Sequence, residues 1–130
     1  MRLPLRDLPG DHGNTRRPVL DVAIAGDQPV ELPCLIDTGA LRTRLPEWAA
    51  RNLGIDLNGL DEELIGLGGA VITSSPVPVV INTAAGPVTS VVWFCRGWHS
   101  EFGLLGQEGF LEHYRFTLDV KEGWFALQPH

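Results

Sequence analysis

Residues 35–40 read Leu-Ile-Asp-Thr-Gly-Ala, and this stretch decides how the rest of the chain is interpreted. The acidic residue Asp37 follows directly on an apolar run, although Asp is disfavoured inside strands and an unpaired carboxylate is costly to bury. Thr38 and Gly39 come next, and Asp-Thr-Gly taken alone is also typical of a simple turn. Whether residues 37–39 form a plain turn or a functional loop therefore depends on the surrounding sequence.

Short apolar runs between turn residues extend over most of the chain, which contains 15 glycines and 10 prolines. No strand–helix alternation is present, which disfavours a doubly wound nucleotide-binding fold. We expect an all-β fold, a closed or sandwich-like β structure with roughly eight strands and one or two short helices. The strands are expected within residues 19–24, 30–36, 63–73, 77–81, 88–94, 104–106, 114–120 and 124–127, and the helices within 46–52 and 107–113.

The overall composition limits the possible functions. The 130 residues form one domain, expected over residues 17–130 after a flexible arm at residues 1–16. A net charge of −6 argues against nucleic-acid binding. No apolar run is long enough to span a membrane and the first residues lack the apolar core of a secretory signal, so we expect a cytoplasmic protein. Cys34 and Cys95 lie in apolar runs and are expected to be buried.

Three separated motifs make the chain resemble the retropepsin-like aspartic proteases, and the bacterial single-domain members in particular. The first is LIDTGA at residues 35–40, the second is a glycine-rich hairpin at residues 65–71, and the third is Leu-Leu-Gly at residues 104–106. The resemblance covers roughly residues 18–127 and implies a small closed β-barrel of the retropepsin type. It implies that the hairpin is a flap covering an extended peptide, with Ile65, Gly66, Leu67, Gly68 and Gly69 as its substrate-binding residues.

The resemblance also implies a catalytic mechanism. In this family two carboxylates share one proton and activate a water molecule that attacks the peptide carbonyl. The chain has one Asp-Thr-Gly, so Asp37 is the expected catalytic residue and the second carboxylate has to come from another copy in a homodimer. Thr38, Gly39 and Ala40 are expected to support the active-site loop. A peptide or protein substrate is implied, and no metal or organic cofactor is expected.

Two departures from the viral members of the family concern the neighbours of this loop. Leu41 and Gln107 replace an acidic residue and an arginine that form an ion pair in the viral enzymes, which weakens the analogy for dimer bracing. Arg42 and Arg44 are either solvated side chains or line a subsite for acidic substrate residues. Leu104 and Leu105 are further subsite candidates.

Two other interpretations stay open at this stage. A catalytically weak or inactive module of the same fold can use the barrel for dimerisation or extended-peptide binding. Alternatively, the chain is monomeric alone and dimerises only with substrate or within a larger assembly. Glu62 and Glu63, at the base of the expected flap, are interpreted as solvated side chains.

Overall fold

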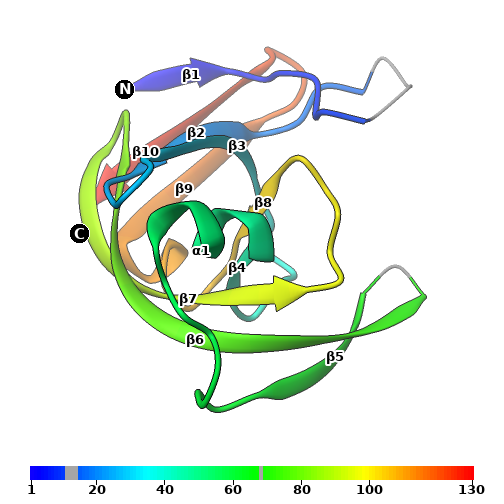
Figure 1. The fold of residues 1–130 in the computed structure, drawn as a ribbon. Helices are drawn as coiled ribbons and strands as arrows, with labels where there is room; N and C mark the ends of the chain where they lie inside the picture. The colour runs from blue at the N-terminus through cyan, green and yellow to red at the C-terminus, as the bar shows by residue number, and fades with distance from the viewer. Residues whose placement is uncertain (11–14, 68) are drawn as a thin grey trace.

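The computed structural model describes residues 1–10, 15–67 and 69–130, and it contains ten strands and one α-helix (Figure 1). The strands are β1 (Arg2–Pro4), β2 (Val19–Ile24), β3 (Val30–Ile36), β4 (Thr43–Pro46), β5 (Glu63–Leu67), β6 (Ala70–Thr83), β7 (Gly86–Arg96), β8 (Gly103–Leu105), β9 (Tyr114–Asp119) and β10 (Trp124–Pro129). The helix α1 spans Glu47–Leu53, and a 3-10 turn covers Leu111–His113.

Six strands close into a barrel in the order β2-β3-β8-β4-β7-β6. A pairing between β2 and β6, at Ala23 and Asn82, closes the barrel. Strand β5 pairs only with β6 and forms with it the hairpin that projects from the barrel (Figure 1). A separate three-stranded sheet, in the order β1-β10-β9, packs beside the barrel. The predicted all-β fold with a closed barrel is confirmed.

The alternating hydrophobic pattern explains the strands at the start of the barrel. Val22 of β2 and Leu32 of β3 are paired and buried, whereas Asp21 and Glu31 on the same strands point to solvent. The helix α1 begins after Pro46, which has the extended backbone that a residue preceding a helix adopts. Gly54 ends the helix with φ of 80°, a left-handed conformation that favours glycine.

Two strands of the three-stranded sheet were predicted, within residues 114–120 and 124–127, but its N-terminal strand β1 was not. Strand β1 pairs with β10, placing Leu3 opposite Phe125, and Leu5 and Leu8 are buried. This differs from the flexible arm expected over residues 1–16, of which residues 11–14 lie outside the described residues. The reason is that the residues that pair with β1 lie 120 to 124 positions away in sequence, where local periodicity gives no signal.

The barrel interior is apolar and includes Cys34, whereas Cys95 is buried beside Arg44, so both cysteines are buried as expected from their sequence context. Phe94, Leu105 and Phe125 are completely buried. Burial raises the pKa of the Cys34 thiol to about 12 and also raises the pKa of Cys95. Both thiols are therefore protonated at neutral pH and are poor nucleophiles. Among the described residues, no helix is long and apolar enough to cross a membrane.

The packing of the N-terminal strand predicts a measurable stability effect. Leu5→Ala removes a side chain that is 5% exposed and is expected to lower the free energy of unfolding by about 2 to 5 kcal/mol in urea titrations. The nearby exposed residue Asp7 provides the control, since Asp7→Ala is expected to change stability by less than about 0.5 kcal/mol. Equal stability of Leu5→Ala and the wild type would show that residues 1–10 do not pack on the barrel.

Candidate active site

Asp37 lies directly after β3, at the start of the loop that leads to β4. Its backbone N–H donates a hydrogen bond to the carbonyl oxygen of Leu105 at 3.0 Å. Its carboxylate oxygen Oδ1 accepts a hydrogen bond from the N–H of Gly39 at 2.9 Å, and its carbonyl oxygen accepts one from Ala40 at 3.2 Å. The carboxylate is therefore oriented by its own loop, while Thr38 and Gly39 are exposed beside it.

Strand β8 fixes this loop because it lies between the strands on either side of it. It runs parallel to β3, with Leu104 opposite Leu35, and antiparallel to β4, with Leu104 also opposite Arg44. At Gly106, just after β8, a Cβ atom would lie 2.8 Å from the carbonyl oxygen of Ala40 and even closer to that of Arg42. Only glycine allows the two backbone segments to approach this closely.

The buried hydroxyl group of Thr43 also binds the segment that contains Gly106. Thr43 is 1% exposed, and its Oγ1 donates to the carbonyl oxygen of Glu108 at 2.9 Å and accepts from the N–H of Gly106 at 3.2 Å. The side-chain amide of Gln107 donates to the carbonyl oxygen of Thr38 at 2.7 Å. Although Gln107 cannot form the ion pair of the viral enzymes, it binds the active-site loop directly.

The predicted flap is the β5–β6 hairpin. The five residue pairs of its ladder run from Glu63 opposite Ser74 to Leu67 opposite Ala70. Gly69 has φ of 84°, which is the left-handed conformation expected of a glycine at a hairpin tip. Gly68 lies outside the described residues. Ile65 is half-buried and Gly66 is exposed, so the hairpin presents both a packed face and an open face.

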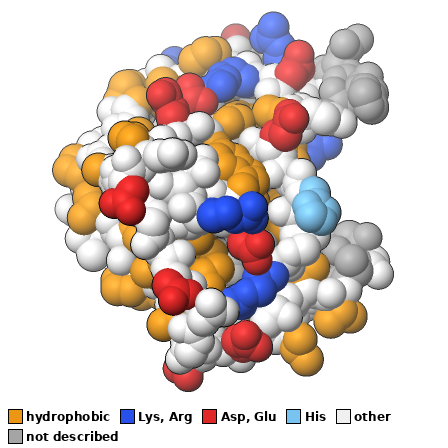
Figure 2. Space-filling model, viewed as in Figure 1, with side chains coloured by type: hydrophobic (Ala, Val, Ile, Leu, Met, Phe, Trp, Pro, Cys, Tyr) orange, Lys and Arg blue, Asp and Glu red, His pale blue; other side chains and the backbone are white. Residues whose placement is uncertain are grey.

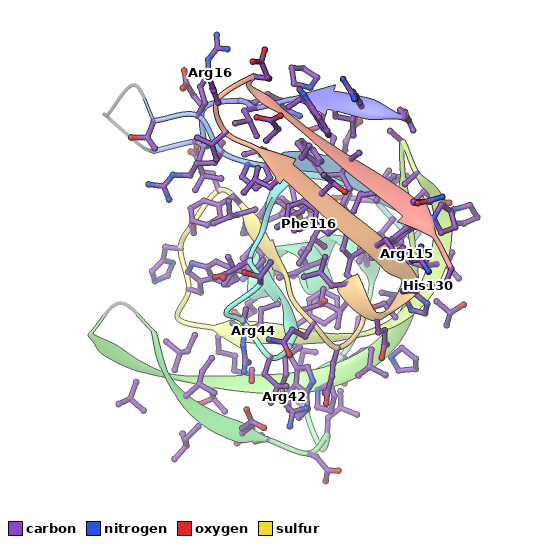
Figure 3. The ribbon with its side chains drawn as sticks, turned by 180° about the vertical axis from the view of Figure 1, so that it is seen from behind. Arg16, Arg42, Arg44, Arg115, Phe116 and His130 are labelled. Carbon is purple, nitrogen blue, oxygen red and sulfur yellow. The ribbon has the colours of Figure 1, made fainter. Side chains whose placement is uncertain are left out.

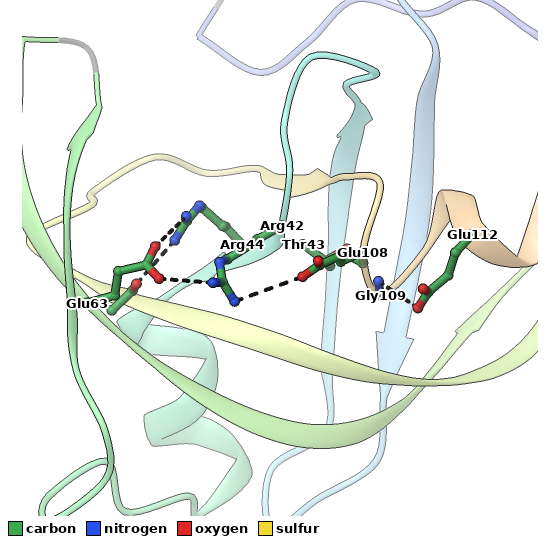
Figure 4. A network of polar contacts seen from close by, with 8 residues as sticks. Arg42, Thr43, Arg44, Glu63, Glu108, Gly109 and Glu112 are labelled. Atoms are coloured by element: carbon green, nitrogen blue, oxygen red, sulfur yellow. Dashed lines mark hydrogen bonds and ion pairs between the residues drawn. The ribbon is translucent and has the colours of Figure 1, made fainter.

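Arg42 directly precedes β4 and Arg44 belongs to it (Figure 3). Both side chains bind Glu63 of the flap strand β5 (Figure 4). Arg42 is 3.1 Å from Oε2 of Glu63 and Arg44 is 3.3 Å from Oε1. Arg42 also stacks on the Trp93 ring at 4.1 Å and lies 4.0 Å from Glu108. The interpretation of Glu63 as a solvated side chain was therefore wrong, because its partners are about twenty positions earlier in sequence.

A second set of ion pairs lies on the face that carries α1, where acidic and basic side chains alternate (Figure 2). Glu47 is 3.1 Å from Arg51 and 3.8 Å from Arg96, and Arg96 is 3.6 Å from Glu62. Glu62 is thus weakly paired and its side chain is 59% exposed. Exposed pairs of this kind contribute little to stability.

The remaining subsite candidates differ in accessibility. Leu104 is 9% exposed and lies beside Arg44, whereas Leu105 is completely buried in the barrel interior. Leu105 therefore supports the site through its carbonyl oxygen, which binds the N–H of Asp37. Residues 1–10, 15–67 and 69–130 contain no cluster of three or more side chains suited to hold a metal ion.

Comparisons with known proteins agree with this geometry. A family model described as aspartyl protease matches residues 20–108, so the chain belongs to this family of aspartic proteases. Among solved structures, the crystal structure of a retropepsin-like aspartic protease from Rickettsia conorii is similar, with a TM-score of 0.67 and 16% identity. The match covers 96% of this chain and 97% of that one, which shows a shared fold. No curated protein sequence matches the chain.

The two hydrogen bonds of Thr43 predict a specific loss of stability. Thr43→Val keeps the shape of the side chain but leaves the Gly106 N–H and the Glu108 carbonyl without this partner. The free energy of unfolding is expected to fall by about 1 to 3 kcal/mol, measured by urea titration. Thr117→Val, at an exposed site in β9, is the matched control and is expected to be neutral. Wild-type stability of Thr43→Val would contradict the bracing role.

Proposed function

We propose that the chain is an aspartic endopeptidase whose active site is formed by Asp37 from two copies in a homodimer. The observation that carries this proposal is the geometry of Asp37, whose carboxylate accepts a hydrogen bond from Gly39 in a partly exposed loop directly after β3, in a chain of the aspartyl protease family. A single copy supplies one such carboxylate. A twofold axis next to Asp37 brings the second one into place without any further sequence requirement.

The proposed reaction needs two carboxyl groups with one proton between them. Two carboxylates in close contact do not both ionise readily, so the pair retains a proton. The ionised carboxylate takes a proton from a water molecule, whose oxygen forms a bond to the peptide carbonyl carbon. The protonated carboxyl group donates to the carbonyl oxygen. The tetrahedral intermediate then collapses as the C–N bond breaks and the nitrogen receives a proton. Activity is expected to be highest at acidic pH.

Exposed apolar side chains support the proposed dimer and substrate surfaces. Leu41, one residue beyond the active-site loop, is 55% exposed. On the flap, Leu64 and Val71 are 74% and 75% exposed. Large apolar side chains at solvent are individually ordinary, but here they occur next to Asp37 and on the hairpin expected to cover it. Contact with a second copy or an extended peptide would remove them from water.

Replacing the catalytic carboxylate tests this function directly. Asp37→Asn keeps the acceptor for the Gly39 N–H but removes the ionisable group, so peptide cleavage is expected to fall at least about 10³-fold. The fold and the dimer, measured by circular dichroism and sedimentation, are expected to persist. Asp7→Asn serves as the control and retains activity.

Two outcomes would contradict the assignment. Cleavage by Asp37→Asn at the wild-type rate would exclude Asp37 as the catalytic residue. A wild-type protein that dimerises and binds peptides without cutting them at any pH would identify a binding module of the same fold.

The two arginines next to the loop are proposed to favour acidic substrate residues. A guanidinium group has five N–H donors, so binding to Glu63 leaves donors of Arg42 and Arg44 for a substrate carboxylate, beside Leu104. A peptide-library profile is expected to show a several-fold preference for Asp or Glu near the cleaved bond that Arg42→Gln reduces. A wild-type profile with no such preference would exclude this subsite.

A further inference from the structure

The point at which the flap leaves the barrel is defined by strand pairing. Strand β6 pairs with β7 from Thr83 back to Thr73, and beyond Thr73 its remaining partner is β5. Thr73 and Ser74 are therefore paired on both sides, Ser74 to Glu63 of β5 and to Cys95 of β7. These two positions form the base of the flap.

Two arginines bind this point of β6 from opposite faces. Ser74 and Ser75 are completely buried, and their side chains point to opposite sides of the sheet. The hydroxyl of Ser74 accepts a hydrogen bond from Arg44 at 3.1 Å, and that of Ser75 accepts one from Arg96 at 3.1 Å. Arg96 also donates to the carbonyl oxygen of Leu57 at 2.9 Å. The flap base is thus attached to the barrel by side chains as well as by the β-ladder.

Glu63 connects this base to the strand that follows the active-site loop. Each of its carboxylate oxygens binds a different guanidinium, that of Arg42 or that of Arg44 (Figure 4). The Arg44 side chain is only 12% exposed, so its charge is poorly solvated without Glu63. The Arg42 group is held in place by stacking on Trp93. Each partner of Glu63 therefore has a second contact, Trp93 for Arg42 and Ser74 for Arg44.

We propose that Glu63 is a positioning residue that sets the height of the flap base over the Asp37 loop. The inference rests on the proposed peptidase function for its kinetic consequences, since a flap contributes by holding the peptide against the catalytic groups. Without the Glu63 carboxylate, the first pair of the flap ladder keeps its backbone bonds and the Arg44–Ser74 hydrogen bond but loses both ion pairs, to Arg42 and to Arg44. The hairpin then samples more open positions, and peptide binding weakens more than the chemical step.

The test compares Glu63→Gln with Glu62→Gln, which removes the charge of the adjacent, mostly exposed carboxylate. Hydrogen exchange of peptides covering residues 63–75 is expected to be about tenfold faster in Glu63→Gln than in the wild type, and unchanged in Glu62→Gln. KM for a peptide substrate is expected to rise several-fold in Glu63→Gln while kcat changes less. A merely structural role would lower the amount of folded enzyme without changing KM.

Exchange and KM equal to those of the wild type would overturn the proposal. If Glu63→Gln does not fold, Arg42→Gln removes one of the two ion pairs and is expected to give a smaller increase in hydrogen exchange. Hydrogen exchange is the readout for this variant, because Arg42 is also proposed to bind substrate. Because hydrogen exchange needs no catalysis, it tests the anchoring role of Glu63 separately from the proposed peptidase function. An inactive wild type with faster flap exchange in Glu63→Gln would refute the peptidase function and retain the anchoring role.

Discussion

The close passage of Gly106 against the loop that carries Asp37 is the constraint on which the site depends. A side chain at this position would collide with the carbonyl oxygens of Ala40 and Arg42. With glycine in place, the chain after β8 reaches the loop, and the N–H groups of residues 107 and 108 bind the carbonyl oxygens of residues 40 and 41 at 2.9 and 2.8 Å. Thr43 binds the same segment through its buried hydroxyl. The loop that carries Asp37 is therefore held from the barrel side.

Ion pairs connect the segment after the Asp37 loop to the flap. The carboxylate of Glu63 binds both Arg42, directly before β4, and Arg44, within β4. On the opposite face, Arg96 binds Ser75 next to weaker pairs with Glu47 and Glu62. Partly buried pairs of this kind specify a geometry more than they add stability. Beyond Thr73, strand β6 pairs with β5 and no longer with β7.

The local hydrophobic pattern was sufficient to predict where barrel strands lie. It was insufficient to predict which residues far apart in the sequence pair with each other. The strands at residues 19–24 and 30–36 were predicted with their observed bounds, because alternating burial leaves a period-two signal. Strands β1 and β4 were missed because they are three and four residues long and their pairing comes from distant segments. The predicted loop residues around Asp37 do lie together, whereas the pairing of Glu63 required knowledge of how β5 packs against β4. The hydrogen bonds of Thr43 to Gly106 and Glu108 could be suspected from the sequence only through its position shortly after Asp-Thr-Gly.

The central claim is that one chain holds half of an active site, and subunit mixing measures it most directly. Wild-type chains are mixed with inactive Asp37→Asn chains at constant total concentration and allowed to exchange subunits before peptide cleavage is assayed. If both carboxylates are required, an equal mixture retains about one quarter of the wild-type activity, because random pairing makes that share of fully wild-type dimers. Retention of about one half, in proportion to the wild-type chains, would show that each chain acts alone and would contradict the shared active site.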